Sequence, residues 1–217
     1  MEKLIIFDVD GVLLDSETLY MEMNQSLFTQ LGADISYSEY QTFIGISGKK
    51  MWTYIKEKSG LSQTVDELIA IEKELKHITL KKTDLIPTIG LVDFLKLLKQ
   101  RSYTIAIASS GLKKNIDLIL QKLNIGEYFE LIVSGEQVAK GKPEPDIFLT
   151  VSEHYHANPK DCIVIEDSKN GVLAAKAAGM FCVGYYNPSS GEQDLSKADL
   201  VIKHFNDFRL VDLIGKN

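Results

Sequence analysis

Two pairs of acidic residues follow apolar stretches that are typical of buried strands. Asp8 and Asp10 follow the first stretch, and Glu166 and Asp167 follow a later one. Parallel strands end at one edge of a sheet, where open α/β proteins bind ligands, so we expect both pairs to face one crevice. An Asp in such a place can also be a turn or helix-cap residue. Helix caps that occur by chance at the ends of two equivalent strands are a poor explanation for two acidic pairs.

Carboxylates that converge on one crevice require a cation. Two carboxylates in close contact repel each other by about 4 kcal/mol at an effective dielectric constant near 20. The two acidic pairs have no histidine or thiolate beside them to act as a softer ligand. Oxygen ligands alone favour Mg²⁺, which keeps several waters and uses few carboxylates. We expect Asp8 and Asp167 to be its direct ligands.

A hydroxyl and an ammonium group stand at the ends of two further strand-like stretches. Ser109 leads into Ser110 and Gly111, and Lys142 precedes Pro143. Both groups suit anionic oxygens, and the proline restricts Lys142 to an extended conformation. Taken singly, Ser109 can be a helix cap and Lys142 a surface lysine, so these two residues gain weight only from the acidic pairs.

The elements that would position these groups are strands alternating with helices from Tyr103 onward. This alternation predicts an α/β fold with βαβ units, a Rossmann-like parallel sheet core and helices on both faces. Strands are predicted at residues 104–109, 131–134, 162–166 and 181–184, and helices at residues 112–123, 147–154 and 171–178.

Residues 17–80 show helical spacing and no convincing strand. Apolar spacing predicts one helix that ends at Gly32 and a second that Ser47 caps. Thr64 and Glu67 form the capping-box pattern of a third helix. An α-helical cap domain is therefore predicted to be inserted after the first strand.

The boundaries of this insertion follow from the change in pattern. We predict a helical cap domain at residues 16–84 and an α/β catalytic core made of residues 1–15 and 85–217. Hinges are expected near Asp15 and Thr83.

Composition excludes several classes of function. The chain has 217 residues and a net charge of −6, which disfavours a nucleic-acid partner. Its apolar runs are far shorter than the roughly 20 residues that span a bilayer, so no membrane partner is expected. The N-terminal residues do not match a signal peptide, and we expect a cytoplasmic protein. No long coiled coil is predicted, and we expect a monomer.

Four ordered motifs resemble those of the haloacid dehalogenase (HAD) superfamily. They are Asp8-Val9-Asp10-Gly11-Val12, Ser109, Lys142-Pro143 and Glu166-Asp167. The helical insertion after the first motif is similar to that of the small-cap group, which includes β-phosphoglucomutase and many phosphatases of small metabolites. The resemblance covers nearly the whole chain.

The resemblance implies a catalytic role for each motif. Asp8 would attack phosphorus and form an aspartyl-phosphate, and Asp10 would act as acid and base. Ser109 and Lys142 would hold the phosphoryl oxygens. Mg²⁺ would be bound by Asp8, the carbonyl of Asp10 and Asp167, with Glu166 as a ligand or a support.

The resemblance favours a phosphatase that hydrolyses a small phosphomonoester, such as a sugar or polyol phosphate. A β-phosphoglucomutase-type mutase is the alternative. Such mutases carry an arginine after Gly-x-Ser in the cap, whereas Gly45-Ile46-Ser47 is followed by Gly48. Their early cap histidine falls at Tyr20. Lys49 can in principle replace the arginine, so the alternative stays open.

A non-catalytic receiver-like module, which also binds Mg²⁺ and accepts phosphate on an aspartate, is a third possibility. A lid suits a hydrolase better than a receiver, because a hydrolase gains from excluding water. Candidate substrate-binding residues are Ser110, Gly111, Tyr20, Asn24, Ser47, Lys49 and Trp52.

Overall fold

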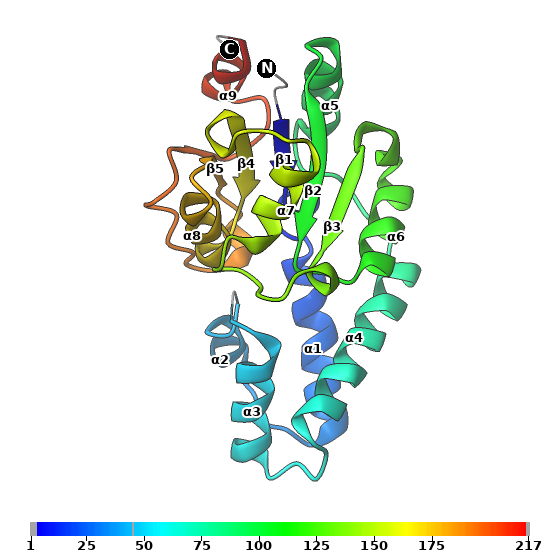
Figure 1. Ribbon diagram of the computed structural model, residues 1–217. Helices are drawn as coiled ribbons and strands as arrows, with labels where there is room; N and C mark the ends of the chain where they lie inside the picture. The colour runs from blue at the N-terminus through cyan, green and yellow to red at the C-terminus, as the bar shows by residue number, and fades with distance from the viewer. Residues whose placement is uncertain (1–3, 45, 216–217) are drawn as a thin grey trace. The chain divides into compact units, whose positions relative to one another are not determined.

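The computed structural model describes residues 4–44 and 46–215, and the chain forms two compact units. One unit consists of Met1–Asp15 and Leu85–Asn217, and the other of Ser16–Asp84 (Figure 1). Each unit has a hydrophobic core of its own. Within the described ranges, no helix is both long enough and apolar enough to cross a membrane.

The first unit contains a six-stranded sheet in which every strand pair is parallel (Figure 1). The strand order is β3-β2-β1-β4-β5-β6. This is the Rossmann order, which reverses direction between β1 and β4, whereas receiver domains have the order 2-1-3-4-5. The predicted fold class is confirmed, and the receiver-like alternative is wrong. The strands are β1 (Leu4–Phe7), β2 (Thr104–Ser109), β3 (Leu131–Ser134), β4 (Cys162–Glu166), β5 (Phe181–Tyr185) and β6 (Leu200–Ile202).

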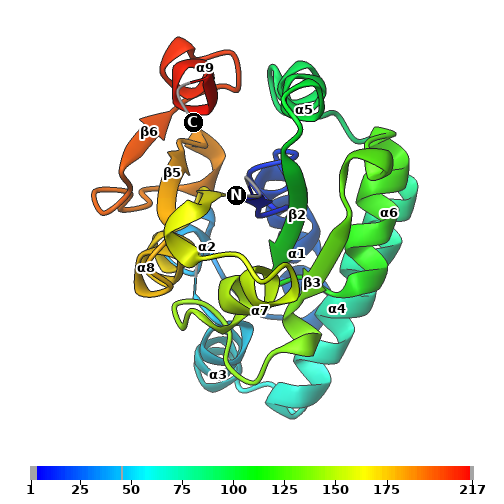
Figure 2. The same cartoon turned by 45° about the horizontal axis from the view of Figure 1, so that its top comes forward.

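Helices cover both faces of this sheet because successive residues of a strand point to opposite faces. In β1, Ile6 belongs to the core cluster that includes Phe148 and Val172, whereas Phe7 packs edge-on against Phe94. Accordingly, α7 and α8 lie on one face and α5 on the other (Figure 2). The helices of this unit are α5 (Leu91–Gln100), α6 (Lys113–Leu123), α7 (Asp146–His154), α8 (Lys169–Ala177) and α9 (Phe208–Gly215).

The second unit is helical, as its sequence pattern predicts. Its core surrounds the fully buried Trp52. Gly32 ends the first helix with a φ of 72°, and Thr64 and Glu67 form both hydrogen bonds of a capping box. Ser47 precedes the third helix, but its hydroxyl makes no capping hydrogen bond. The helices are α1 (Glu17–Leu31), α2 (Tyr37–Gln41), α3 (Gly48–Ser59) and α4 (Val65–Lys82).

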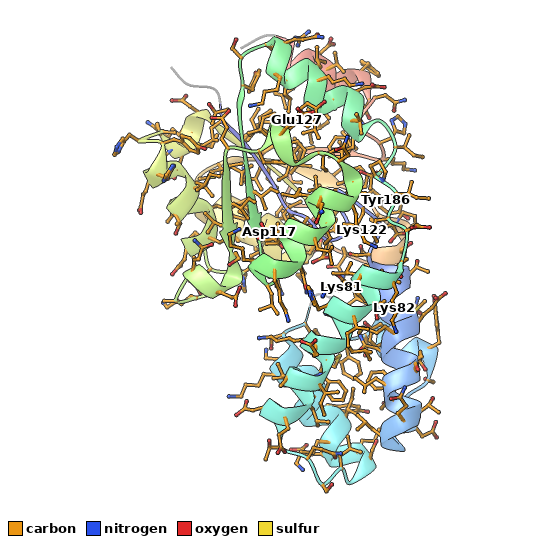
Figure 3. All side chains as sticks on the ribbon, turned by 90° about the vertical axis from the view of Figure 1, so that its right-hand side faces the viewer. Lys81, Lys82, Asp117, Lys122, Glu127 and Tyr186 are labelled. Atoms are coloured by element: carbon orange, nitrogen blue, oxygen red, sulfur yellow. The ribbon has the colours of Figure 1, made fainter. Side chains whose placement is uncertain are left out.

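The structure extends the predicted elements at several places. It adds α2, α5, β6 and α9 to the predicted elements. Helix α8 begins two residues before the predicted start, because Ser168 caps it by accepting a hydrogen bond from the backbone N–H of Gly171 at 3.0 Å. On α6 the outer side chains are polar, among them Asp117 and Lys122 (Figure 3), while Ile116 and Ile119 are buried against the sheet unit.

Candidate active site

The two acidic pairs lie at the point where the strand order reverses. Strands β1 and β4 are neighbours, with Phe7 opposite Ile165. The backbone N–H of Asp8 continues this pairing by donating to the carbonyl oxygen of Ile165 at 3.0 Å. The residues after both strands therefore emerge side by side at the edge of the sheet where Rossmann-like folds bind ligands.

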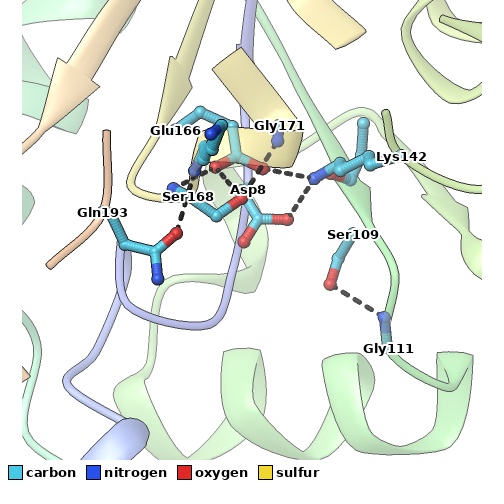
Figure 4. Close-up of polar contacts among 10 residues, drawn as sticks. Asp8, Ser109, Gly111, Lys142, Glu166, Ser168, Gly171 and Gln193 are labelled. Atoms are coloured by element: carbon cyan, nitrogen blue, oxygen red, sulfur yellow. Dashed lines mark hydrogen bonds and ion pairs between the residues drawn. The ribbon is translucent and has the colours of Figure 1, made fainter. Parts of the chain in front are cut away.

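Lys142 joins the two strand ends. Its Nζ donates to Asp8 Oδ1 at 2.6 Å, to Glu166 Oε1 at 2.8 Å and to the carbonyl oxygen of Ala108 at 3.1 Å (Figure 4). The Nζ also lies 5.0 Å from the centre of the Phe148 ring. The lysine side chain is only 6% exposed, so Lys142 is not an ordinary surface lysine. All three of its donor hydrogens have acceptors within the unit.

Glu166 holds Lys142 rather than facing outward. Its Oε2 accepts hydrogen bonds from the backbone N–H and the hydroxyl of Ser168, at 2.7 and 2.9 Å. Its Oε1 binds Lys142, so both carboxylate oxygens are engaged and the residue is 1% exposed (Figure 4). A Cβ on Gly171 would lie 1.8 Å from Glu166 Cδ, so only glycine leaves room for this carboxylate. The geometry therefore indicates that Glu166 holds Lys142 in place.

Asp167 is packed against the loop that follows β1. Its Oδ2 accepts a hydrogen bond from Ser190 Oγ at 2.6 Å. Gly11 adopts a φ of +76°, and a Cβ there would lie 2.0 Å from the same Oδ2. The cap of α8 is Ser168, so helix capping does not explain Asp167. The carboxylate is 5% exposed and lies beside the first acidic motif.

Ser109 and Asp10 meet around the turn that follows β2. Ser109 Oγ accepts a hydrogen bond from the backbone N–H of Gly111 at 3.1 Å (Figure 4). A Cβ on Gly111 would lie 3.3 Å from Ser109 Oγ and 3.8 Å from Asp10 Oδ2. The cap residue of α6 is Leu112, so Ser109 is not a helix cap. Ser110, next in this turn, is exposed.

Asp10 carries a buried acceptor that the described part of the chain leaves open. Its Oδ1 is inaccessible to solvent and has no hydrogen-bond partner there. A buried carboxylate oxygen without a partner is costly, so such an atom points to a group that binds from outside the chain. This feature agrees with a ligand site at the strand ends.

The charges of the site are strongly coupled. Burial raises the pKa of Asp8 to about 7, although the charge of Lys142 acts in the opposite direction. Burial acts to lower the pKa of Lys142, but the charges of Asp8 and Glu166 and their hydrogen bonds raise it above its usual value. Lys142 therefore remains charged at neutral pH, and the burial of Asp8 opposes the ionised form of its carboxylate.

The oxygen ligands at this edge fit Mg²⁺. Asp8 and Asp167 carry carboxylate oxygens at neighbouring strand ends, and Asp10 lies in the turn that follows Asp8. Over residues 4–44 and 46–215, no three His, Cys, Asp or Glu side chains form a ready-made metal cage. Mg²⁺ uses one or two carboxylates and keeps several waters, so it does not need one.

The predicted substrate residues of the helical insertion belong to the second unit. Ser47 and Lys49 are exposed there. Tyr20 is buried, and its ring centre lies 4.7 Å from the Nζ of Lys76. Gly45 of the Gly-x-Ser pattern lies outside the described residues.

Two further substrate candidates of the second unit are core residues. Trp52 is fully buried and donates its Nε1 hydrogen to Glu72 Oε2 at 2.7 Å. Asn24 is fully buried and donates its amide to the hydroxyl of Tyr40 at 2.9 Å. Neither side chain reaches the surface of the unit, which argues against direct contact between these two residues and a substrate.

Sequence reasoning missed the loop after β5. Ser190 binds Asp167, and Gln193 Oε1 accepts from the backbone N–H of Lys169 at the start of α8 (Figure 4). The only sequence signal in this segment is the cluster of Asn, Pro and Ser at residues 187–190. Such a cluster predicts a loop but does not indicate which residues the loop contacts.

Comparison with known proteins agrees with this geometry. Residues 5–185 match the family model described as haloacid dehalogenase-like hydrolase. The chain is 33% identical to β-phosphoglucomutase of Bacillus subtilis, covering 96% of this chain and 92% of that protein. It is 30% identical to a phosphorylated carbohydrates phosphatase of Thermotoga maritima, covering 81% of each chain.

The solved structure of β-phosphoglucomutase from Clostridium difficile superimposes with a TM-score of 0.80 at 27% identity, covering 100% of this chain and 98% of that one. The family match spans the motifs at the ends of β1, β2 and β4, together with Lys142. The chain belongs to the haloacid dehalogenase-like hydrolase family.

Proposed function

We propose that the protein is a Mg²⁺-dependent phosphatase that hydrolyses a small phosphomonoester, such as a sugar or polyol phosphate, through an aspartyl-phosphate on Asp8. The observation that carries this proposal is the buried network in which Lys142 binds both Asp8 and Glu166. This network fixes one carboxylate oxygen of Asp8, so the direction of the other oxygen is fixed as well. A rigidly oriented carboxylate is what an in-line attack on phosphorus requires.

The first chemical step forms a bond between a carboxylate oxygen of Asp8 and phosphorus. The bond from phosphorus to the ester oxygen breaks, and Asp10 in its protonated form gives its proton to the leaving alkoxide. Lys142 stabilises the phosphoryl oxygens by its positive charge, and Ser109 donates its hydroxyl hydrogen to one of them.

The second step releases phosphate. Asp10, now ionised, takes a proton from a water molecule, whose oxygen attacks phosphorus and breaks the bond to Asp8. The products are the alcohol, inorganic phosphate and the original carboxylate.

The metal would be held by Asp8, the carbonyl of Asp10 and Asp167. When bound, Mg²⁺ supplies positive charge that offsets the repulsion between the Asp8 carboxylate and the substrate phosphate. Glu166 supports this arrangement through Lys142 and Ser168.

The test is phosphate release from a panel of sugar, polyol, nucleotide and glycolate phosphates, with Mg²⁺ and with a chelator. We expect Asp8→Asn to abolish release, because the amide is a poor nucleophile. Asp10→Asn should cripple release while leaving Mg²⁺ binding largely intact, because the carbonyl of residue 10 is retained. Unchanged turnover in Asp8→Asn would end the nucleophile assignment.

A phosphomutase is the second candidate, favoured by the 33% identity to the β-phosphoglucomutase of Bacillus subtilis. Such a reaction needs a group that holds the second phosphate of a bisphosphate intermediate. The segment that follows Ser47 offers Lys49 and no arginine. Conversion of a hexose 1-phosphate into its 6-phosphate isomer would support the mutase, and hydrolysis without isomerisation would exclude it.

The second unit, Ser16–Asp84, is proposed as the cap domain that gives substrate specificity. Its exposed polar residues Ser47 and Lys49 are the candidates for contact with the alcohol part of the substrate. We propose a small phosphorylated metabolite as the only partner that the activity requires, with the protein acting as a cytoplasmic monomer.

A further inference from the structure

The loop after β5 reaches the edge of the sheet where β1 and β4 end. Ser190 Oγ donates to Asp167 Oδ2 at 2.6 Å, and the two residues are 2% and 5% exposed. The amide of Asn187 donates to the carbonyl oxygen of Gly11 at 3.5 Å. The loop thus contacts both the second acidic motif and the turn that follows the first.

Ser190 is held in place from both sides. On one side its backbone N–H donates to the carbonyl oxygen of Asn187 at 3.1 Å, while Asn187 Oδ1 accepts from the N–H of Ser189 at 2.9 Å. On the other side Gln193 Nε2 donates to the carbonyl oxygen of Ser190 at 3.0 Å. Gln193 Oε1 in turn binds the N–H of Lys169, at the start of α8 (Figure 4). The hydroxyl is therefore positioned by the same helix that follows Asp167.

A hydroxyl fixed in this way controls the carboxylate that it binds. A hydrogen bond to an ionised oxygen is stronger than one between neutral groups, so it holds the carboxylate in one orientation. Mg²⁺ demands near-ideal octahedral geometry, so a ligand that rotates freely binds it poorly. Partners of ligating carboxylates typically change metal affinity by about 10- to 100-fold when they are removed.

We propose that Ser190 is a positioning residue for Asp167, and that its hydroxyl sets the affinity of the site for Mg²⁺. This inference rests on the proposed function, in which Asp167 is a ligand of the metal. It assigns to the loop after β5 a part in metal binding that the four sequence motifs do not contain.

The experiment is a calorimetric titration of the substrate-free protein with Mg²⁺, made on the parent and three variants. Ser190→Ala removes the hydroxyl, and Ser190→Thr keeps it. Ser189→Ala is the matched control in the same turn, because Ser189 Oγ donates to Asp15 Oδ2 at 2.7 Å and not to Asp167. Urea unfolding without metal checks that each variant is folded.

We expect Ser190→Ala to weaken Mg²⁺ binding by about 10- to 100-fold, from the effect of such partners in other metal sites. Ser189→Ala should remain within about twofold of the parent, and Ser190→Thr should recover most of the affinity. In phosphate release, Ser190→Ala should raise the Mg²⁺ concentration for half-maximal rate while kcat at saturating Mg²⁺ changes little, since Ser190 acts through Asp167.

Equal or tighter Mg²⁺ binding by Ser190→Ala would overturn the inference and leave the proposed phosphatase intact. An equal loss in Ser189→Ala would also overturn it, because the effect would then belong to the fold of the loop. A parent protein that binds no Mg²⁺ would overturn the proposed metal site together with the inference.

Discussion

Replacing Gly171 by alanine should dismantle the charge network of the site from a residue that bears no functional group. A Cβ at this position would lie 1.8 Å from Glu166 Cδ and Oε1 and 2.4 Å from Oε2. Such a contact is impossible, so the carboxylate must leave its position between Lys142 and Ser168. Lys142 then loses one of its two anionic partners, and the hydrogen bonds to Ser168 are lost as well.

The magnitude follows from two opposing effects. Breaking a buried charge pair from one side costs about 3–5 kcal/mol. Alanine is favoured over glycine in a helix by about 1 kcal/mol. We therefore expect a net loss of about 2–4 kcal/mol in the free energy of unfolding. For a chain of this size, that loss lowers Tm by about 5–15 °C.

Urea unfolding and phosphate release measure the two consequences. Activity should fall with stability, because Lys142 no longer holds Asp8 in one orientation. Gly48→Ala is the matched control, since Gly48 also lies in a helix and a Cβ there would meet only Glu72 Oε2 at 3.9 Å. That control should be neutral or slightly stabilising. A Gly171→Ala variant as stable and as active as the parent would refute the role given to Glu166.

Two further predictions concern the metal and the helical unit. Burial raises the pKa of Asp8 to about 7, and Mg²⁺ requires the ionised carboxylate, so protons compete with the metal below that pH. The Mg²⁺ affinity measured by calorimetry should therefore fall from pH 8 to pH 6, and the buffer should take up the protons that binding releases. An affinity that does not depend on pH would contradict this. Trp52→Phe leaves the buried Glu72 without its indole donor and should lower the free energy of unfolding in urea by about 1–3 kcal/mol. Tyr54→Phe removes a hydrogen bond between exposed groups and should lower it by less than about 0.5 kcal/mol. Equal losses in the two variants would contradict the argument from burial.

The fold was largely predictable because its strands are short apolar runs and its helices are periodic. The elements that were missed differ in kind. Helix α5 carries a clear helical stripe, Leu91, Phe94, Leu95 and Leu98, so its signal was present in the sequence. Strand β6 has three residues, of which Val201 is exposed, and a strand so short has no readable period.

The site was predictable as a pattern of strand ends and not as a network. Acidic residues after two apolar runs indicate a shared edge, which the pairing of β1 with β4 provides. The contact between Lys142 and Asp8 joins residues 134 positions apart, and no local pattern encodes such a distance. Ser190 illustrates the same limit, because its role depends on how the loop after β5 folds back.

The central position of β1 in the sheet affects how the chain folds during its synthesis. This strand leaves the ribosome before both of its neighbours in the sheet, β2 and β4. Until residues 162–166 have been translated, one edge of this wholly apolar strand has no partner. Unpaired apolar edges are templates for aggregation. The nascent chain thus passes through a long interval, from the synthesis of Phe7 to that of Cys162, in which β1 lacks one of its two neighbours.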